Sequence, residues 1–514
     1  MSVGINYPSV AQLASIASGF GLDMTESEVL EYRDLMGAMV RYCREIEQMA
    51  EPIPAVKYPR NPGFRPVGEE NPYNAWYWRT EIAGAKEGPL SGYIVGVKDA
   101  ICVAGVPAMN GSRILEGYVP TVDATVVTRL LDAGAVIVGK TSTDDLCMAG
   151  TGHTCALGPV KNPRRPTHAT GGSSAGSAAA LAAGDVRLAL GGDQGGSIRI
   201  PAAWCGVVGL KPTYGLVPYT GCMMMEMTLD HVGPMARTVA DCAAMLSVIA
   251  GPDGQDPRQR GAIPDTYDRD YGSAIEKDIN TIRIGIVREG FSHRWPEPGL
   301  PESDEAVDSR VRAACSVFER LGATVEEVSI PLHLAGVAIY SVLFQQGTLE
   351  FMIKGNGLGT NWAGYYNTGL GDAFARGLSS RPNDLPPSVK LLMLSAEYLK
   401  KFYHGRYYGK AQNLRENLRR AYDRVLNSYD VLVMPTVPYL PIKIPEPGCS
   451  TTVEVRAGGT QIGNVCQACL TGHPSITVPC GEVDGLPVGL MITGRHFEDA
   501  TVLRVASAFE KAHA

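Results

Sequence analysis

Two segments dense in glycine and serine lie close together in the chain and restrict what the backbone around them can form. Residues 171–177 read Gly-Gly-Ser-Ser-Ala-Gly-Ser, and residues 191–197 read Gly-Gly-Asp-Gln-Gly-Gly-Ser. Glycine supplies 59 of the 514 residues, about 11%, where roughly 7% is usual. Because glycine has no Cβ, such segments allow tight turns and leave backbone amides unshielded. They fit either a loop whose amides face an anion beside Ser197 or a turn with capping serines.

Strand and helix patterns alternate along most of the chain. Strand patterns cover residues 93–97, 136–138, 282–287, 430–434, 475–478 and 488–492, and helix patterns cover 124–133, 303–321 and 499–511. We expect Asp123 to open the helix 124–133, and helix signals rich in aromatics predict a helical insertion around 333–428. The prediction is an α/β fold, with a large mixed β-sheet covered by helices on both faces.

The first 50 residues predict a small helical extension. Thr25 and Glu28 have the spacing of a capping box, and an apolar stripe on one long helix runs from Leu35 to Met49. The stripe could pack on the main body or on a second subunit, and we favour a homodimer or higher homo-oligomer. Prolines at 52, 54, 59, 62, 66 and 72 predict an extended linker over 51–79, and the main domain is expected over 80–514.

Charge and composition exclude several functions. The formal net charge is −7, which provides no general field for phosphates, so we expect no nucleic-acid partner. No run of about 18 apolar residues and no secretory leader pattern occur, which predicts a cytoplasmic protein without a membrane association. The twelve cysteines are interpreted as buried apolar residues, and the pair Cys466 and Cys469 lacks the partners of a zinc site. We expect no metal and no cofactor.

Two motifs suggest other chemistry but fail on their context. Residues 134–141 match the phosphate-binding loop expression, yet their four variable positions form a strand that follows a helix. Residues 172–176 match a nucleophile elbow centred on Ser174, but the residues before them do not form an apolar strand. We therefore assign neither nucleotide binding nor a nucleophilic role to these motifs.

Ser197 is the candidate nucleophile, and Lys98 is the candidate base. Ser197 precedes a short predicted helix, 198–204, whose N-terminal partial charge favours an anion. A serine hydroxyl needs a base, and this region contains no suitable histidine. Lys98 ends the strand 93–97, where burial would favour the neutral amine that a base requires. The alternative is a surface lysine paired with Asp99.

Taken together, the two glycine-rich segments and Lys98 resemble the amidase signature family from about residue 80 to the C-terminus. The residues 110–112, 191–197 and 494–497 and the helical extension are similar in particular to nitrile-hydratase-linked bacterial amidases. The resemblance implies a Ser–cis-Ser–Lys triad. In it Ser197 is the nucleophile, Ser173, joined to Gly172 by a cis peptide, is the bridging hydroxyl, and Lys98 is the base.

The same resemblance implies roles for the neighbouring residues. It places the backbone amides of Gln194, Gly195, Gly196 and Ser197 in an oxyanion hole, with the Gln194 side chain beside the substrate. We expect Asp193 and Arg199 to form a buried pair that fixes this loop, and Ser174 to have a structural role.

The expected reaction is hydrolysis of small aliphatic and aromatic amides to a carboxylic acid and ammonia through an acyl-Ser197 intermediate. A methionine-rich run, 222–227, could line the acyl pocket or fill the core. Three alternatives remain: a carbamate (urethane) hydrolase, an amidotransferase subunit in a tRNA-dependent complex, and a non-catalytic binding protein on the same fold.

Overall fold

A computed structural model describes residues 4–295 and 300–513 of the chain. The chain divides into two compact units, residues 1–55 and residues 56–514. Residues 56–75, expected to be linker, belong to the second unit and contact both its sheet and a covering helix. Phe64 bridges to Arg79 on the first strand, and Lys57 and Tyr58 both contact Asp132 at the end of the helix 125–132. The second unit therefore begins well before residue 80.

Over residues 4–55, the described part of the first unit, the chain forms three helices: α1 (Val10–Gly19), α2 (Glu26–Leu35) and α3 (Gly37–Glu47). The predicted capping box is present at the start of α2, where Thr25 Oγ1 accepts from the Glu28 N–H and the Thr25 N–H donates to the Glu28 carboxylate. The apolar stripe is divided between two helices instead of lying on one, because the helix is interrupted at Met36. Gly37 follows the break, and the Tyr7 ring fills the space where its Cβ would lie.

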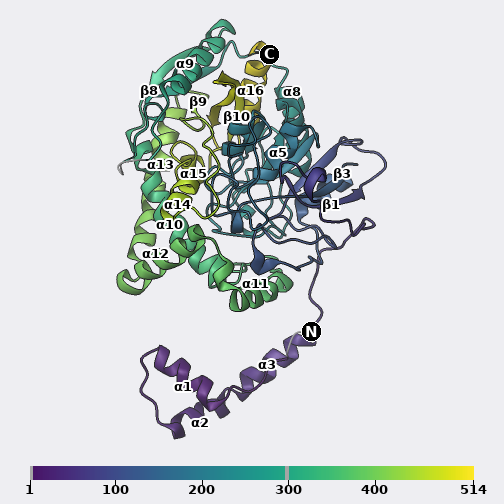
Figure 1. Cartoon of the computed structure of the whole chain (residues 1–514), viewed down its shortest axis with the longest axis vertical. Coiled ribbons are helices and arrows are strands. Elements are labelled where there is room, and N and C mark those ends of the chain that lie inside the picture. The colour runs from purple at the N-terminus through teal and green to yellow at the C-terminus, as the bar shows by residue number, and fades with distance from the viewer. Residues whose placement is uncertain (1–3, 296–299, 514) are drawn as a thin grey trace. The chain divides into compact units, whose positions relative to one another are not determined.

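One mixed sheet forms the core of the second unit. In the described part of the chain eleven strands lie in the order β1-β3-β2-β4-β6-β5-β10-β11-β9-β7-β8, with β1 and β8 at opposite ends (Figure 1). The strands are β1 (Trp76–Ala83), β2 (Ile94–Lys98), β3 (Val136–Thr141), β4 (Leu188–Gly192), β5 (Val208–Lys211), β6 (Val232–Ala236), β7 (Arg283–Val287), β8 (Thr324–Val328), β9 (Val431–Pro435), β10 (Ser475–Val483) and β11 (Leu486–Gly494). Strand β2 runs parallel to β3 and β4, and β7 runs parallel to β8 and β9, while the other pairs are antiparallel.

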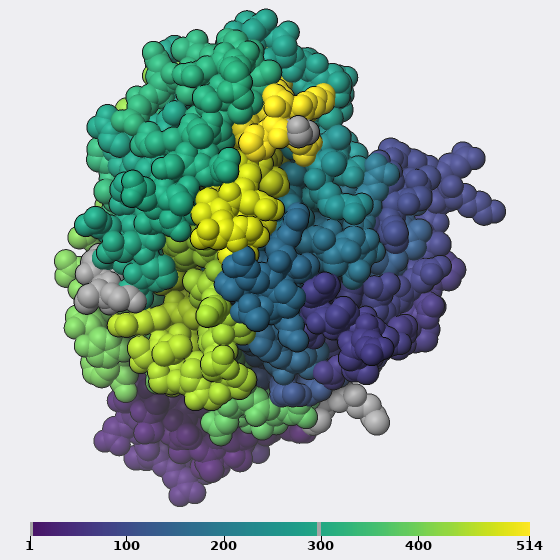
Figure 2. Space-filling model, turned by 45° about the horizontal axis from the view of Figure 1, so that its top comes forward, coloured from purple at the N-terminus to yellow at the C-terminus, as the bar shows by residue number. Residues whose placement is uncertain are grey.

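Helices cover both faces of this sheet, which confirms the predicted α/β class. The helices are α4 (Thr125–Asp132), α5 (Ala175–Ala183), α6 (Arg199–Cys205), α7 (Val239–Ile249), α8 (Tyr271–Ala274), α9 (Glu305–Arg320), α10 (Gly336–Thr348), α11 (Thr368–Ser380), α12 (Pro387–Tyr403), α13 (Arg406–Leu426), α14 (Thr451–Gly459), α15 (Cys466–Thr471) and α16 (Asp499–His513). Helices α5 and α6 pack together on one face, and α7, α9 and α16 pack on the other. Figure 2 shows α16, in yellow, between segments from much earlier in the chain. Among the described residues, no helix is both long and apolar enough to cross a membrane.

Two local expectations were wrong. Helix α4 is not opened by Asp123, because its N-cap is Ala124 and the Asp123 carboxylate instead accepts from the Ala104 N–H and pairs with Arg60. The sequence patterns also missed β1, β6 and β8. They missed β4 and β5 too, two short strands whose glycines and lysine dilute the apolar signal. Both strands are completely buried.

Helix α5 packs unusually close to the sheet because its residues are small. A Cβ at Gly176 would collide with the backbone of Ala75 and Ser142. Alanine normally stabilises a helix over glycine, but Gly176→Ala is expected to destabilise the protein by about 1–3 kcal/mol through this collision. Denaturant unfolding of the purified variant measures the change.

Gly409 provides the matched control. It lies within α13, and no atom lies within 4 Å of the position of its missing Cβ. Gly409→Ala is therefore expected to stabilise the protein by about 0.5–1 kcal/mol. If Gly176→Ala and Gly409→Ala changed the free energy of unfolding in the same direction, this result would contradict the close packing of α5.

Candidate active site

Lys98 is the last residue of β2, which lies between its two parallel neighbours, β3 and β4. Its side chain is fully buried, and Nζ donates to Ser173 Oγ over 2.7 Å and to the Gly192 carbonyl over 3.3 Å. The alternative surface pair with Asp99 is not formed, because Asp99 pairs instead with the buried Lys140 (Nζ–Oδ1 3.1 Å). Lys98 therefore points toward the glycine-rich segments.

Ser173 lies in the first glycine-rich segment, just before α5. The Gly172–Ser173 peptide is cis, and the Ser173 carbonyl accepts from Thr143 Oγ1 over 2.8 Å. The Asp144 carboxylate occupies the position where a Cβ on Gly172 would lie. Only glycine fits at this position without moving that carboxylate.

Ser197 lies in the turn between β4 and α6 and opens into a cavity. Ser197 is 8% exposed. Its backbone carbonyl accepts from the Ser174 N–H over 3.1 Å, and this hydrogen bond joins the two glycine-rich segments. The cavity has a volume of about 180 Å³. Its lining is mainly apolar and includes Met148, Ile200, Tyr340, Phe344, Leu391, Leu392 and Ile462.

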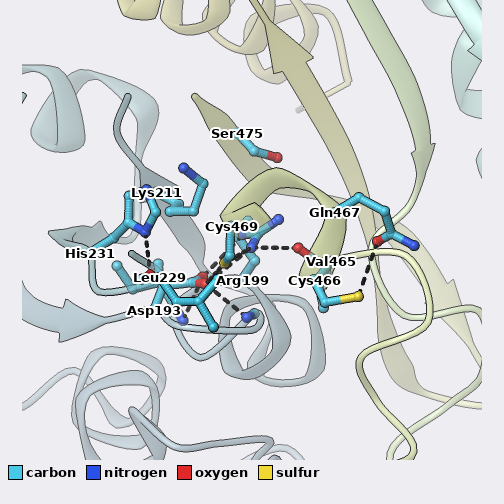
Figure 3. A network of polar contacts seen from close by, with 12 residues as sticks. Asp193, Arg199, Lys211, Leu229, His231, Val465, Cys466, Gln467, Cys469 and Ser475 are labelled. Carbon is cyan, nitrogen blue, oxygen red and sulfur yellow. Dashed lines mark hydrogen bonds and ion pairs between the residues drawn. The ribbon is translucent and has the colours of Figure 1, made fainter. Parts of the chain in front are cut away.

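The loop before Ser197 is organised by the Asp193 carboxylate (Figure 3). Asp193 accepts from the Gly196 N–H (2.7 Å) and the Ile198 N–H (3.1 Å), and it pairs with the guanidinium of Arg199, itself fully buried. Burial alone would raise the pKa of Asp193, but the charge and hydrogen bonds of Arg199 outweigh it and hold that pKa well below its usual range. The carboxylate is therefore ionised and fixes the loop.

This arrangement changes the set of amides open to an oxyanion. The Gly196 amide, expected in the oxyanion hole, is used by Asp193. The amides of Gln194, Gly195 and Ser197 have no acceptor among the described residues. These three N–H groups remain as candidates.

Gln194 is held from behind by a tyrosine that the sequence analysis missed. Its Nε2 donates to Tyr219 Oη over 2.9 Å, while its buried Oε1 has no partner in the described part of the chain. That oxygen can accept a hydrogen bond from an amide N–H of a bound molecule.

A third buried lysine, Lys211, lies near the loop. Lys211 ends β5, and its Nζ donates to the Pro212 carbonyl over 2.9 Å. Burial lowers its pKa to about 8. Nearby, the His231 carbonyl accepts from the Asp193 N–H (2.9 Å), and the His231 ring contacts the Leu229 carbonyl (Figure 3). The signal for Lys211 was present in the sequence, since it also ends a short apolar strand.

Two other candidates have internal roles. The Ser174 hydroxyl donates to the Gly192 carbonyl and accepts from the Gly192 N–H, which ties it to β4. In the methionine-rich run, Met223, Met224 and Met225 are buried in the apolar core. Among the described residues that line the cavity at Ser197, none comes from this run.

Comparison with known proteins agrees with this site. A model of the amidase family matches residues 47–503, so the chain belongs to the amidase family, as the resemblance predicted. It is 42% identical to an enantioselective amidase of Rhodococcus rhodochrous, over 98% of this chain and 96% of that protein. It is 41% identical to a glutamyl-tRNA(Gln) amidotransferase subunit of Exiguobacterium sibiricum, over 84% of this chain and 86% of that subunit.

A solved structure with a similar fold is the peptide amidase of Stenotrophomonas maltophilia. Its TM-score is 0.66 at 30% identity, and the match covers 83% of each chain. The family and these relatives establish an amide hydrolase.

The buried Lys211 generates a prediction for stability against pH. Its pKa of about 8 in the folded protein lies below the roughly 10.4 of an unfolded lysine. Between these values the unfolded chain binds more protons, so the free energy of unfolding rises with pH there by up to about 3 kcal/mol. Lys211→Met should lose this rise, measured by denaturant unfolding from pH 7.5 to 10.

Lys410→Met is the control for this prediction, because Lys410 is exposed on α13. The difference between this variant and the unmodified protein should not change over the same pH range. A pH-dependent rise that survives in Lys211→Met would show that another group causes it.

Proposed function

We propose that this protein hydrolyses small aliphatic and aromatic primary amides to a carboxylic acid and ammonia through an acyl-Ser197 intermediate. The observation that carries the proposal is the contact of Lys98 Nζ with Ser173 Oγ at 2.7 Å, in a segment whose next residue, Ser174, donates its N–H to the Ser197 carbonyl. A buried amine in contact with a hydroxyl is the arrangement that a proton relay needs.

The proposed reaction begins with Ser197 Oγ attacking the amide carbonyl. Its proton passes through Ser173 to the Lys98 amine, and the oxyanion faces the amides of Gln194, Gly195 and Ser197. The relay then returns the proton to the leaving nitrogen, and ammonia departs. Water attacks the acyl-enzyme along the same relay and releases the acid.

The cavity supports small apolar acyl groups. Its volume of about 180 Å³ is similar to the roughly 150 Å³ of an apolar cavity that binds benzene. Phenyl and short alkyl groups fit this size and lining.

Purified enzyme should hydrolyse benzamide and propionamide faster than ethyl carbamate, because the carbamate ether oxygen and ethyl group place a polar atom in an apolar cavity. Steady-state kcat/KM for the three compounds measures this preference. A clear preference for ethyl carbamate would favour the urethane hydrolase instead.

Similarity to the amidotransferase subunit supports a second candidate function. In this function the chain would hydrolyse amides as one component of a complex. The Rhodococcus amidase matches 98% of this chain and the Exiguobacterium protein 84%, which favours the independent amidase. Turnover of free amides by the purified chain alone distinguishes the two functions.

Substitutions separate the relay from its neighbours. Ser197→Ala and Lys98→Met should each lower kcat on benzamide by at least roughly a thousandfold, since each removes a group that takes part in bond formation or proton transfer. Ser174→Ala should keep most of the activity and lose about 1 kcal/mol of stability with its two hydrogen bonds.

Mass spectrometry of the enzyme quenched during turnover should find the acyl group on Ser197. Lys98→Met with unchanged kcat, or an acyl group on Ser174, would overturn the assigned roles.

A further inference from the structure

Asp423, His473 and His496 come from three separate elements and meet at one end of the β10–β11 pair. Asp423 lies on α13, His473 lies in the turn between α15 and β10, and His496 lies in the turn between β11 and α16. The two turns are held together because the Gly494 N–H donates to the Pro474 carbonyl over 3.1 Å. One potential ligand atom from each of the three residues lies within 4.8 Å of the others.

The hydrogen bonds of Thr471 determine which nitrogen of His473 carries the proton. Thr471 Oγ1 donates its one proton to the Gln467 carbonyl over 2.9 Å, so it accepts from His473 Nδ1 at 2.9 Å. A neutral His473 therefore carries a lone pair on Nε2, which lies 3.0 Å from Asp423 Oδ1. Two lone pairs face each other unless a cation or a proton lies between them.

His496 contributes a third lone pair to the same place. Its Nε2 lies 2.9 Å from the Thr471 carbonyl, which can only accept, so Nε2 carries the ring proton. The lone pair is then on Nδ1, 3.8 Å from Asp423 Oδ1. Both imidazoles thus have their second nitrogen fixed by Thr471, as metal-binding histidines usually do.

The carboxylate is divided between two partners. Arg419 Nη1 contacts Asp423 Oδ2 over 2.8 Å, which leaves Oδ1 toward the histidines. The His473 side chain is fully buried, while those of Asp423 and His496 are 33% and 28% exposed. The cluster therefore has one side open to water.

We propose that Asp423 Oδ1, His473 Nε2 and His496 Nδ1 bind a divalent transition-metal cation such as Zn²⁺, with water as the fourth ligand. Two imidazoles and one carboxylate form a common zinc ligand set. Tetrahedral bonds of about 2.0–2.1 Å separate ligand atoms by about 3.3–3.4 Å. The separations from Asp423 Oδ1 of 3.0 and 3.8 Å bracket that value, so small side-chain shifts complete the site.

The metal would have a structural role in this position. None of the three ligands is among the described residues that line the cavity at Ser197. A cation here fastens α13 to the ends of β10 and β11, and α13 packs on α10, which carries the cavity residues Tyr340 and Phe344. The site thus braces one wall of the cavity without touching substrate, and it does not depend on the proposed function.

The test is calorimetric titration of Zn²⁺ into the full chain after treatment with a chelator. One Zn²⁺ per chain is expected, together with a rise in the thermal midpoint of unfolding. His496→Ala removes a partly exposed ligand and should weaken binding by more than roughly a hundredfold, since even loss of an outer-shell partner costs about 10–100-fold. Thr471→Val, which removes such a partner from His473, should fall in that 10–100-fold range.

His513→Ala is the matched control, because His513 is an exposed histidine at the end of α16. It should bind Zn²⁺ as the unmodified protein does. Circular dichroism checks that every variant is folded. The proposal is overturned if the unmodified chain binds no stoichiometric Zn²⁺ or if His496→Ala binds it equally well. Nitrogen NMR showing protons on both ring nitrogens of His473 in zinc-saturating buffer would also overturn it, because a proton would then occupy the site.

Discussion

The buried pair of Asp193 and Arg199 is the interaction on which the candidate active site depends. Both side chains are inaccessible to water, and the Asp193 oxygens also receive the Gly196 and Ile198 amides. The Arg199 guanidinium in turn donates to the Val465 carbonyl, just before α15. Removing either partner would leave an isolated buried charge, which is far more costly than a missing surface ion pair. The loop is therefore rigid because its charges are balanced internally.

This rigidity separates the chemistry of the site from its selectivity. The groups of the proposed relay come from β2 and the segments on either side of β4, two neighbouring inner strands of the sheet. Much of the cavity lining comes from outside the sheet, namely from α10, α12 and the segment after α14. Phe344, Leu391 and Ile462 lie outside the strands, so substitutions there can change the cavity without changing the sheet. This division fits a family whose relatives include both an amidase and an amidotransferase subunit.

The sequence predicted what local patterns encode. Apolar alternation located β2, β3, β7, β9, β10 and β11, and the two glycine-rich segments indicated the family and the position of Ser197. Contacts that depend on loop conformation escaped it. The Gly196 amide is used by Asp193 because of how one short loop folds. The support of Gln194 by Tyr219 and the convergence of His473 with His496 depend on turns whose mutual position no local pattern specifies. The expectation for Asp123 was wrong because a capping residue is chosen by its neighbours in space, here Arg60 and Ala104.

The contact of Arg199 with the Val465 carbonyl also has a consequence during synthesis, because the two residues leave the ribosome at different times. The two residues are 266 positions apart, and β5 finds its partner β10 only after residue 475. A ribosome adding roughly 5–20 residues per second exposes the loop around Ser197 for tens of seconds before this partner emerges. During that time Arg199 lacks the Val465 carbonyl as a partner. A growing chain therefore cannot complete the contacts of Arg199 until the segment around Val465 has been synthesised.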